Sequence, residues 1–432
     1  MRDALRGLTT RGRSFLAAGV AVFVAAIVLV EQDLMRIAVL LMALPLVSAW
    51  VVARTRYRLS SSRRLSAART PAGQESAVTL RLDNISRLPS GLLLVEDRVP
   101  YVLGSRPRFV LDRIEPRGRR EVTYVVRSDV RGRYQLGPLT LRLTDPFGMC
   151  ELQRAFSSRD TLIVTPPVQQ LPPAALAGQW AGSGDSRARS VASAGEDDAG
   201  TREYRQGDDL RRVHWRSTAR LGQLMVRREE QPWQSRCTIL LDSRTVAHAG
   251  EGPASSFEWA VSATASIGVH LMRSGYQVRL LTDTGDKLVS ADQDPSSVGS
   301  DFEGLLLDSL AVLASSSNDS CRDAATTLRR GGGDGLLIAV LGSIDPEEAR
   351  LFAQLRHGST VAVAVLLDTS TWMSGRGREP RHDYDGSAAL LRASGWRVVQ
   401  ARAGDSIAGL WPEAGRRQHD SELVQVETVG KR

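Results

Sequence analysis

Lysine is almost missing from this chain of 432 residues: it occurs at Lys287 and Lys431 only, so arginine carries nearly all of the positive charge. The formal net charge of +8 therefore owes much to a bias towards arginine. Binding to a phosphate backbone needs basic residues concentrated on one face. Here the arginines are spread along the chain beside acidic neighbours, except near the N-terminus, so we expect no nucleic-acid partner.

Cysteine and histidine are also scarce, and neither shows the spacing of a metal site. The three cysteines are odd in number and far apart, which is typical of a reducing compartment: Cys150, Cys237 and Cys321. Cys237 opens an apolar run, so we expect a small core residue there. Residues 331–335 are glycine-rich but lack the Gly-Lys-Ser/Thr ending of a phosphate loop. No catalytic residue, metal ion or cofactor is predicted.

Two uncharged apolar runs stand near the N-terminus, at residues 14–30 and 37–53. Each is at the short end of what spans a bilayer, and together they predict a transmembrane helical hairpin within residues 1–55. Arginines flank both outer ends, whereas the connecting loop EQDLMR is mainly acidic, so the N-terminus and the rest of the chain should be cytoplasmic. Alternatively, the first run is a signal peptide cleaved near residues 24–26. The second run would then stop transfer, and the remaining chain would still face the cytoplasm.

Short alternating patterns between residues 56 and 167 predict a β-sandwich-like domain. Residues 77–82 (AVTLRL) and 121–126 (EVTYVV) are the clearest strands. RGRYQLGP at residues 131–138 and DPFG at 145–148 combine turn formers with an aromatic residue. We expect a hairpin and a corner that pin the sheet, and no binding site.

Residues 236–415 alternate apolar strands with amphipathic helices, which predicts an α/β domain with a mostly parallel sheet covered on both faces. Expected strands lie at residues 237–241, 278–281, 336–341, 361–367 and 397–400. A helix should start with Asp345 as N-cap, Pro346 at its first position and Glu348 at its third. Ligands of such sheets bind at the carboxyl ends of the strands. This rule points to Asp242, Asp283, Thr284 and residues 343–345.

The most distinctive segment lies at residues 201–235, after a polar stretch at 168–200 that we expect to be a linker, and contains the run REYRQGDDLRRVHWRSTAR. Charge crowded around aromatic rings marks a specified site, although a solvated charge run is the alternative. Nine residues are singled out as a signature and interaction site: Arg202, Glu203, Tyr204, Gly207, Asp208, Arg211, His214, Trp215 and Arg220.

A physical hypothesis follows for this segment. Asp208 or Asp209 should cap a short helix in which Leu210, Val213 and Trp215 can be buried. An ion-pair network would hold the segment against the α/β domain, with Tyr204 and Trp215 as apolar anchors. Its members would be Arg202, Glu203, Asp208 and Arg211. For His214 we expect packing or hydrogen bonding before general-base chemistry.

The run REYRQGDDLRRVHWRSTAR, with RGRYQLGP and DPFG upstream and the α/β region downstream, resembles the bacterial family called domain of unknown function 58 (DUF58). This resemblance covers nearly the whole chain beyond the hairpin. It implies a protein of the bacterial cell membrane with a von Willebrand factor A-like domain at residues 236–415, followed by a tail at 416–432. It also implies a MoxR-type AAA+ ATPase as partner, with a transglutaminase-like membrane protein as a further one.

A von Willebrand-type metal site needs Asp-x-Ser-x-Ser on its first loop, because a hard divalent cation prefers oxygen ligands. This chain has Asp242, Ser243 and Arg244 there, followed by Thr245 and Val246, so the metal loop is degenerate. The guanidinium of Arg244 would repel a cation and could pair with Asp242. We therefore expect the fold to be kept and metal-dependent adhesion to be lost.

Two functions remain open at this stage. The first is a membrane-anchored cytoplasmic scaffold that works with the ATPase in the assembly or maturation of a protein complex. The second is a hydrolase that uses the acidic and histidine residues of the signature.

Overall fold

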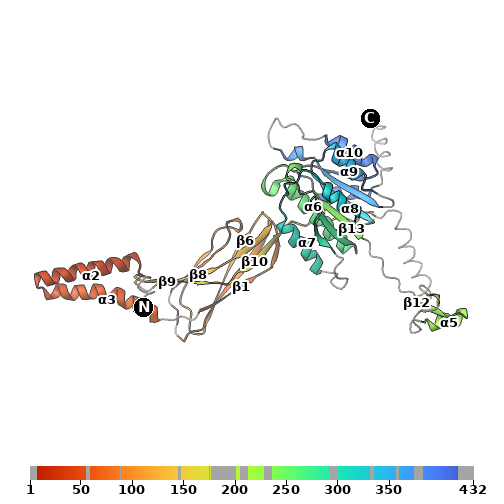
Figure 1. Cartoon of the computed structure of the whole chain (residues 1–432). Helices are drawn as coiled ribbons and strands as arrows, with labels where there is room; N and C mark the ends of the chain where they lie inside the picture. The colour runs from red at the N-terminus through yellow and green to blue at the C-terminus, as the bar shows by residue number, and fades with distance from the viewer. Residues whose placement is uncertain are drawn as a thin grey trace, which may run out of the picture. The chain divides into compact units, whose positions relative to one another are not determined.

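Two long apolar helices begin the described part of the chain, α2 (Thr10–Leu29) and α3 (Gln32–Arg54) (Figure 1). The computed structural model describes residues 7–54, 59–87, 89–90, 92–144, 147–174, 176, 201–204, 213–227, 236–290, 300–330, 335–356, 360–373 and 383–416. The chain divides into two compact units, Met1–Thr165 and Pro166–Arg432.

Both helices start earlier in the chain than the apolar runs that predicted them. The Thr9 side chain accepts the N–H of Gly12 at 3.2 Å and so caps α2 ahead of the apolar run. The helices pack closely, because a Cβ added at Gly19 would come within 2.6 Å of the Met42 side chain. Large apolar side chains such as Val28 remain exposed on their outer surface. Both helices are long and apolar enough to cross a membrane.

The remainder of the first unit is rich in strands. β1 (Leu59–Leu65), β3 (Glu75–Asn84) and β6 (Arg119–Arg127) form one sheet, and β2 (Arg69–Pro71), β10 (Asp160–Thr165) and β7 (Gly132–Leu136) form a second. A third contains β5 (Arg108–Leu111), β4 (Leu93–Asp97), β8 (Leu139–Thr144) and β9 (Glu151–Phe156). Alternate residues of these strands point into one apolar core. The strands predicted at residues 77–82 and 121–126 are confirmed, and they pair in antiparallel register.

The two turn motifs form one corner between sheets and one hairpin connection, as expected. RGRYQLGP does not close a hairpin, because β7 and β8 belong to different sheets and the chain turns between them at Gly137 and Pro138. Gly137 has φ of 101°, and a Cβ there would lie 2.8 Å from the Ser158 carbonyl oxygen. By contrast, Phe147 and Gly148 lie in the connection of the β8–β9 hairpin. Residues 145 and 146 lie outside the described residues.

The α/β region has one sheet of six strands, in the order β15-β14-β13-β16-β17-β18. Five strands are parallel, and β15 pairs antiparallel at one edge. The strands are β13 (Arg236–Leu241), β14 (Gln277–Thr282), β15 (Lys287–Ser290), β16 (Leu336–Leu341), β17 (Val361–Leu367) and β18 (Arg397–Ala401). All five strands that were predicted are present, and Cys237 is buried in the core as expected. The short edge strand β15 was not predicted.

Helices cover both faces of this sheet. On one face Ile239 and Leu241 pack with α6 (Ser256–Arg273), α7 (Ser300–Val312) and α11 (Ile407–Gly415). On the other, Leu240 packs with α8 (Arg322–Arg330), α9 (Pro346–Ala353) and α10 (Tyr384–Ala393). Neighbouring residues of β13 therefore pack on opposite faces, which explains why every residue from Cys237 to Leu241 is buried.

The first part of the expected linker is packed against the α/β core. Leu171 and Leu176 are buried in the same cluster as α6 and α11. The backbone N–H of Gln169 donates to Ser266 Oγ at 2.9 Å, and its side chain accepts the N–H of Ala408 at 3.3 Å. Residues 168–174 and 176 thus belong to the α/β domain, whereas residues 177–200 lie outside the described part of the chain.

Candidate functional site

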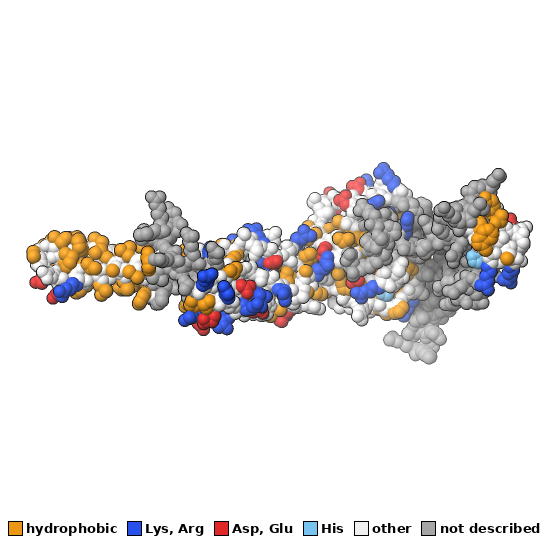
Figure 2. Space-filling model, turned by 90° about the horizontal axis from the view of Figure 1, so that it is seen from below, with side chains coloured by type: hydrophobic (Ala, Val, Ile, Leu, Met, Phe, Trp, Pro, Cys, Tyr) orange, Lys and Arg blue, Asp and Glu red, His pale blue; other side chains and the backbone are white. Residues whose placement is uncertain are grey.

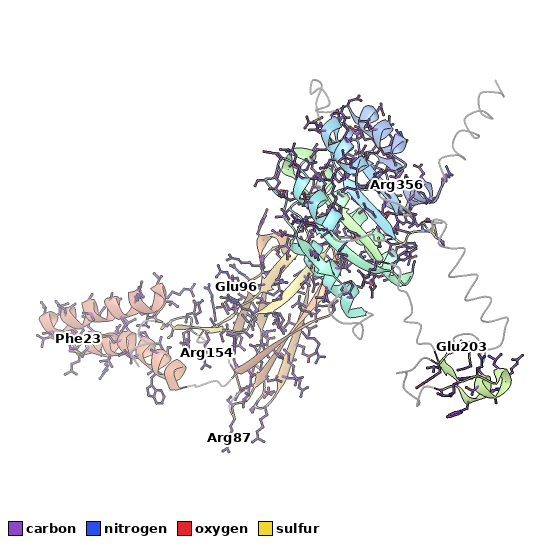
Figure 3. The ribbon with its side chains drawn as sticks, turned by 45° about the vertical axis from the view of Figure 1, so that its right-hand side comes forward. Phe23, Arg87, Glu96, Arg154, Glu203 and Arg356 are labelled. Atoms are coloured by element: carbon purple, nitrogen blue, oxygen red, sulfur yellow. The ribbon has the colours of Figure 1, made fainter. Side chains whose placement is uncertain are left out.

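The signature segment forms a small folded piece of its own. β11 (Thr201–Glu203) pairs antiparallel with β12 (Met225–Arg227), and α5 (Trp215–Leu221) lies between them in the sequence. Val213 bridges to Val226, and both side chains are buried. The N–H of Tyr204 donates to the Leu224 carbonyl at 2.8 Å, which extends the pairing beyond β11. Figure 3 marks Glu203 on this piece.

His214, and not Asp208 or Asp209, caps the helix. Its Nδ1 accepts the N–H of Ser217 at 3.3 Å and lies 2.8 Å from the Ser217 hydroxyl oxygen. The imidazole thus supplies the acceptor for the first turn of α5, whereas Asp208 and Asp209, the expected caps, lie outside the described residues. The hydrogen-bonding role expected for His214 is present in the structure.

Trp215 is not a buried anchor, contrary to expectation. It begins α5 and is 69% exposed, and Leu221 and Leu224 are also exposed. The interior of the piece is occupied by smaller side chains instead, among them Val213 and Ser217. Figure 2 shows hydrophobic side chains gathered beside arginines on the visible face of this piece.

The proposed ion-pair network cannot be placed. Gly207, Asp208 and Arg211, with the neighbouring Asp209 and Leu210, lie outside the described residues. Arg202 pairs with Val226 through the strand register, and Glu203 and Arg220 are exposed. The ion-pair network therefore stays a hypothesis.

A second candidate site lies at the carboxyl edge of the six-stranded sheet, where Asp242 follows β13. The guanidinium of Arg244 donates from Nε and Nη2 to the two oxygens of Asp242, each at 2.9 Å. Its Nη1 also donates to Glu348 of α9 and to the Asp319 carbonyl. Asp242 and Arg244 are both at most 2% exposed. The pairing anticipated from the sequence is present, and it holds two loops and a helix together.

Asp283, at the end of β14, is buried next to this ion pair. Its Oδ1 accepts the N–H of Ser243 at 3.1 Å and the Ser243 hydroxyl. Its Oδ2 accepts the Ser316 hydroxyl at 2.6 Å. Ser316 belongs to the segment after α7, and its backbone bridges to Arg244. The segment around Ser316 therefore covers the carboxyl edge of the sheet, where ligands of such sheets bind.

Other residues expected at this edge have separate roles. Thr284 Oγ1 donates to Asp286 at 2.8 Å within a turn. Asp345 caps α9, and Glu348 completes the reciprocal capping box, so the predicted helix start is confirmed. Glu348 also forms an ion pair with Arg244. The sequence did not predict this pair, because the capping box already accounted for a glutamate at position 348.

Burial sets the protonation of the groups around the ion pair. Burial, the largest single effect, acts to lower the pKa of Arg244, but the hydrogen bonds to Asp242 and the negative charges of Asp242 and Glu348 together raise that pKa above its ordinary value. Burial also raises the pKa of Glu348, against the attraction of Arg244. The pKa of the Cys321 thiol is raised, first by burial and then by the charge of Asp242. Cys321 is thus held as an unreactive thiol.

His248 is partly buried behind the first loop, in a neutral form. Its Nε2 donates to the Asp242 carbonyl at 2.8 Å, and its Nδ1 accepts the Ser256 hydroxyl at 3.0 Å. Desolvation lowers the pKa of His248 below its ordinary value, although the charge of Asp242 opposes this shift. The ring therefore connects the loop to α6 at neutral pH.

Comparison with known families now bears on both sites. The family model described as "Protein of unknown function DUF58" matches residues 200–302. This match supports the DUF58 family for the chain. The matched DUF58 region runs from β11 through β15 into α7, and so contains both Trp215 and the Asp242–Arg244 pair. Comparison with curated proteins gives no match.

Two solved structures each resemble part of this chain. A putative ApaA protein from Bordetella pertussis is 14% identical, covers 25% of this chain and 94% of its own, and has a TM-score of 0.20. The CARDB domain of a Pyrococcus furiosus protein, in complex with di-metal ions, is 11% identical, covers 25% and 88%, and has a TM-score of 0.19. At these TM-scores the likenesses carry no argument about fold or function.

Proposed function

We propose that this chain is a membrane-anchored cytoplasmic interaction protein of the DUF58 family. It would work with a MoxR-type AAA+ ATPase in the assembly or maturation of a protein complex. The observation that carries the proposal is the exposed apolar surface of the signature piece, where Trp215, Leu221 and Leu224 lie outside a small, already filled interior. Exposed tryptophan is common among the residues that dominate the affinity of protein interfaces.

The two larger domains fit this role as scaffolds. The strand order β15-β14-β13-β16-β17-β18, with one antiparallel edge, supports a von Willebrand factor A-like domain. The sheets around one shared core support a β-sandwich-like domain before it. On this proposal the first domain positions the second, and the signature piece makes the contact.

The carboxyl edge of the α/β sheet favours a protein-interaction role that needs no metal ion over metal-dependent adhesion. Arg244 puts a fixed positive charge against Asp242, and the segment around Ser316 satisfies Asp283. A divalent cation would have to displace a buried guanidinium that has two carboxylate partners. We infer that arginine replaces the metal as the structural cation of this edge.

The membrane part of the proposal depends on α2 and α3. Arginines flank the outer ends of the helices, and the positive-inside rule then puts both ends in the cytoplasm of a bacterial cell. A transglutaminase-like membrane protein is a further candidate partner.

The direct test is affinity capture on the full chain in detergent. The bait is incubated with extract that contains either a non-hydrolysable ATP analogue or ADP, and bound proteins are identified by mass spectrometry. Recovery of a MoxR-type ATPase that differs between the ATP analogue and ADP supports the proposal. Recovery that is the same with both nucleotides, or that also occurs without the bait, contradicts it.

A hydrolase centred on the signature is the second candidate, and one contact favours it: His214 Nδ1 lies 2.8 Å from Ser217 Oγ. Ser217 is only 2% exposed, however, and the same Nδ1 caps the helix. Turnover of ester or peptide substrates that is lost in Ser217→Ala, with the fold retained, would favour this candidate.

A further inference from the structure

The connection between β8 and β9 is joined to the first turn of α2, and this contact lies entirely within the first unit of the chain. Leu8 forms an antiparallel bridge with Cys150. The N–H of Thr9 donates to the Met149 carbonyl at 2.9 Å, and the N–H of Glu151 donates to the Gly7 carbonyl at 2.7 Å. The segment before the helix is therefore hydrogen-bonded to the strand-rich domain through an isolated β-bridge.

Side chains reinforce the contact from both helices. The Thr9 hydroxyl donates to the Gly148 carbonyl at 2.7 Å, while the same oxygen caps α2. Ala49 of α3 packs in a small buried cluster with Cys150 and Leu152. The Met149 carbonyl approaches Gly12 so closely that no Cβ fits there. The domain is thus fixed to the end of the hairpin where α2 begins and α3 ends.

Phe147 stands at this contact with 60% of its surface exposed. The Arg11 guanidinium is close by, 3.7 Å from the position that a Gly148 Cβ would take. The apolar run of α2 starts near Phe15, roughly 8 Å along the helix axis from Thr10. A headgroup layer is about 5–8 Å thick on each side of a bilayer. An exposed apolar ring can be buried at the boundary between headgroups and acyl chains, and a guanidinium on a long side chain can reach the headgroups, so this pair matches the chemistry of that layer.

We propose that the β8–β9 connection, residues 147–151, is a membrane-contact element that holds the strand-rich domain on the bilayer. Phe147 would lie in the headgroup layer beside Arg11. This inference rests on the proposed insertion of α2 and α3. Its partner is the lipid surface that surrounds the hairpin. β9, which bears Arg154, leads away from this element into the domain (Figure 3).

The strand register supplies a matched control position. In the register of β4 and β8, Leu93 pairs with Leu143 and Asp97 with Leu139. The residues that follow Asp97 therefore leave the sheet at the end opposite the β8–β9 connection. Tyr101 is 94% exposed there, about 13 Å or more from the β8–β9 connection along the strand direction. It shares the domain with Phe147 but should not reach the lipid.

The test uses the full chain in vesicles of phosphatidylcholine and phosphatidylglycerol. Phe147→Cys, Tyr101→Cys and, in the middle of α2, Val24→Cys are each labelled with an environment-sensitive fluorophore. All three native cysteines are buried, and unsubstituted protein measures background labelling. We expect headgroup-labelled quencher lipid to reduce emission at position 147 and not at 101, and tail-labelled lipid to reduce it at 24.

Two results are distinguishable failures. Quenching at 24 without quenching at 147 overturns the membrane-contact element while leaving insertion intact, and no quenching at 24 overturns insertion itself. A second variant checks that the domain stays joined to α2. Leu8 and Cys150 form a non-hydrogen-bonded pair, whose Cα atoms are close enough for a disulfide. Leu8→Cys should cross-link to Cys150 on oxidation and Thr10→Cys should not; failure of the Leu8→Cys cross-link also overturns the proposal.

Discussion

Arg244 shows how a single residue can change the chemistry of a loop while the fold remains. It occupies the first hydroxyl position of the metal-binding pattern, and its guanidinium places a positive charge against Asp242 at the carboxyl edge of the sheet. The sequence could suggest its pairing with Asp242, because the two are neighbours on one loop. It could not suggest Glu348, Asp319 or Ser316, because these come from segments that only the fold brings together.

Removal of Arg244 should strongly destabilise the protein. Arg244→Ala leaves the buried Asp242 carboxylate without its partner, which typically costs about 3–5 kcal/mol of unfolding free energy. Arg273→Ala is the control, since Arg273 is paired with Glu303 but exposed, and such pairs contribute about 0–1 kcal/mol. Denaturant unfolding of the full chain in detergent measures both. Equal, small losses would show that the ion pair does not stabilise this edge.

His248 should make stability depend on pH. Its pKa in the folded state is lowered from 6.5, so its contribution is present above that value and is lost as pH falls. The melting temperature should therefore decline between about pH 7 and pH 5, and less so in His248→Gln, which keeps an N–H donor for the Asp242 carbonyl. His270→Gln, at a less buried histidine, should keep most of the decline. An unchanged decline in His248→Gln would assign it to other groups.

At the scale of elements, local signals predicted most of the α/β region, and non-local pairing limited the rest. Asp345, Pro346 and Glu348 gave a helix start that the structure confirms, because a capping box is complete within four residues. The start of the short helix α5 was not predicted, since His214 caps it and histidine is an uncommon cap. The sequence did not decide which of RGRYQLGP and DPFG forms the corner, because a local turn signal does not reveal which sheet each strand joins.

Gly137 offers a test of that corner. Gly137→Ala should cost about 1–3 kcal/mol from its positive φ, with a further loss because the new Cβ meets the Ser158 carbonyl oxygen. Gly104→Ala is the matched control, since Gly104 also has a positive φ but has no atom within 4 Å of a new Cβ. Unfolding experiments on both variants separate strain from contact. Equal losses would mean that close approach at Gly137 does not matter.

At the scale of the whole molecule, composition and long apolar runs predicted two apolar helices, a strand-rich region and an α/β region in the correct order. The exposed surface of the signature piece could not be predicted in the same way. An aromatic residue among charges suggests either a buried anchor or a contact surface, and only the filled interior around Val213 and Ser217 distinguishes the two. Trp215 is therefore the residue on which the proposed function depends most.

The binding of a MoxR-type ATPase to the full chain in nanodiscs tests this claim most directly. The dissociation constant is measured with ATP analogue and with ADP, for the unsubstituted chain, Trp215→Ala and the control Tyr101→Ala, whose side chain is 94% exposed on the strand-rich domain. We expect nucleotide-dependent binding that Trp215→Ala weakens about tenfold or more, with an unchanged melting temperature, and that Tyr101→Ala leaves intact. Equal affinity for all three proteins, or no binding in either nucleotide, would contradict the account.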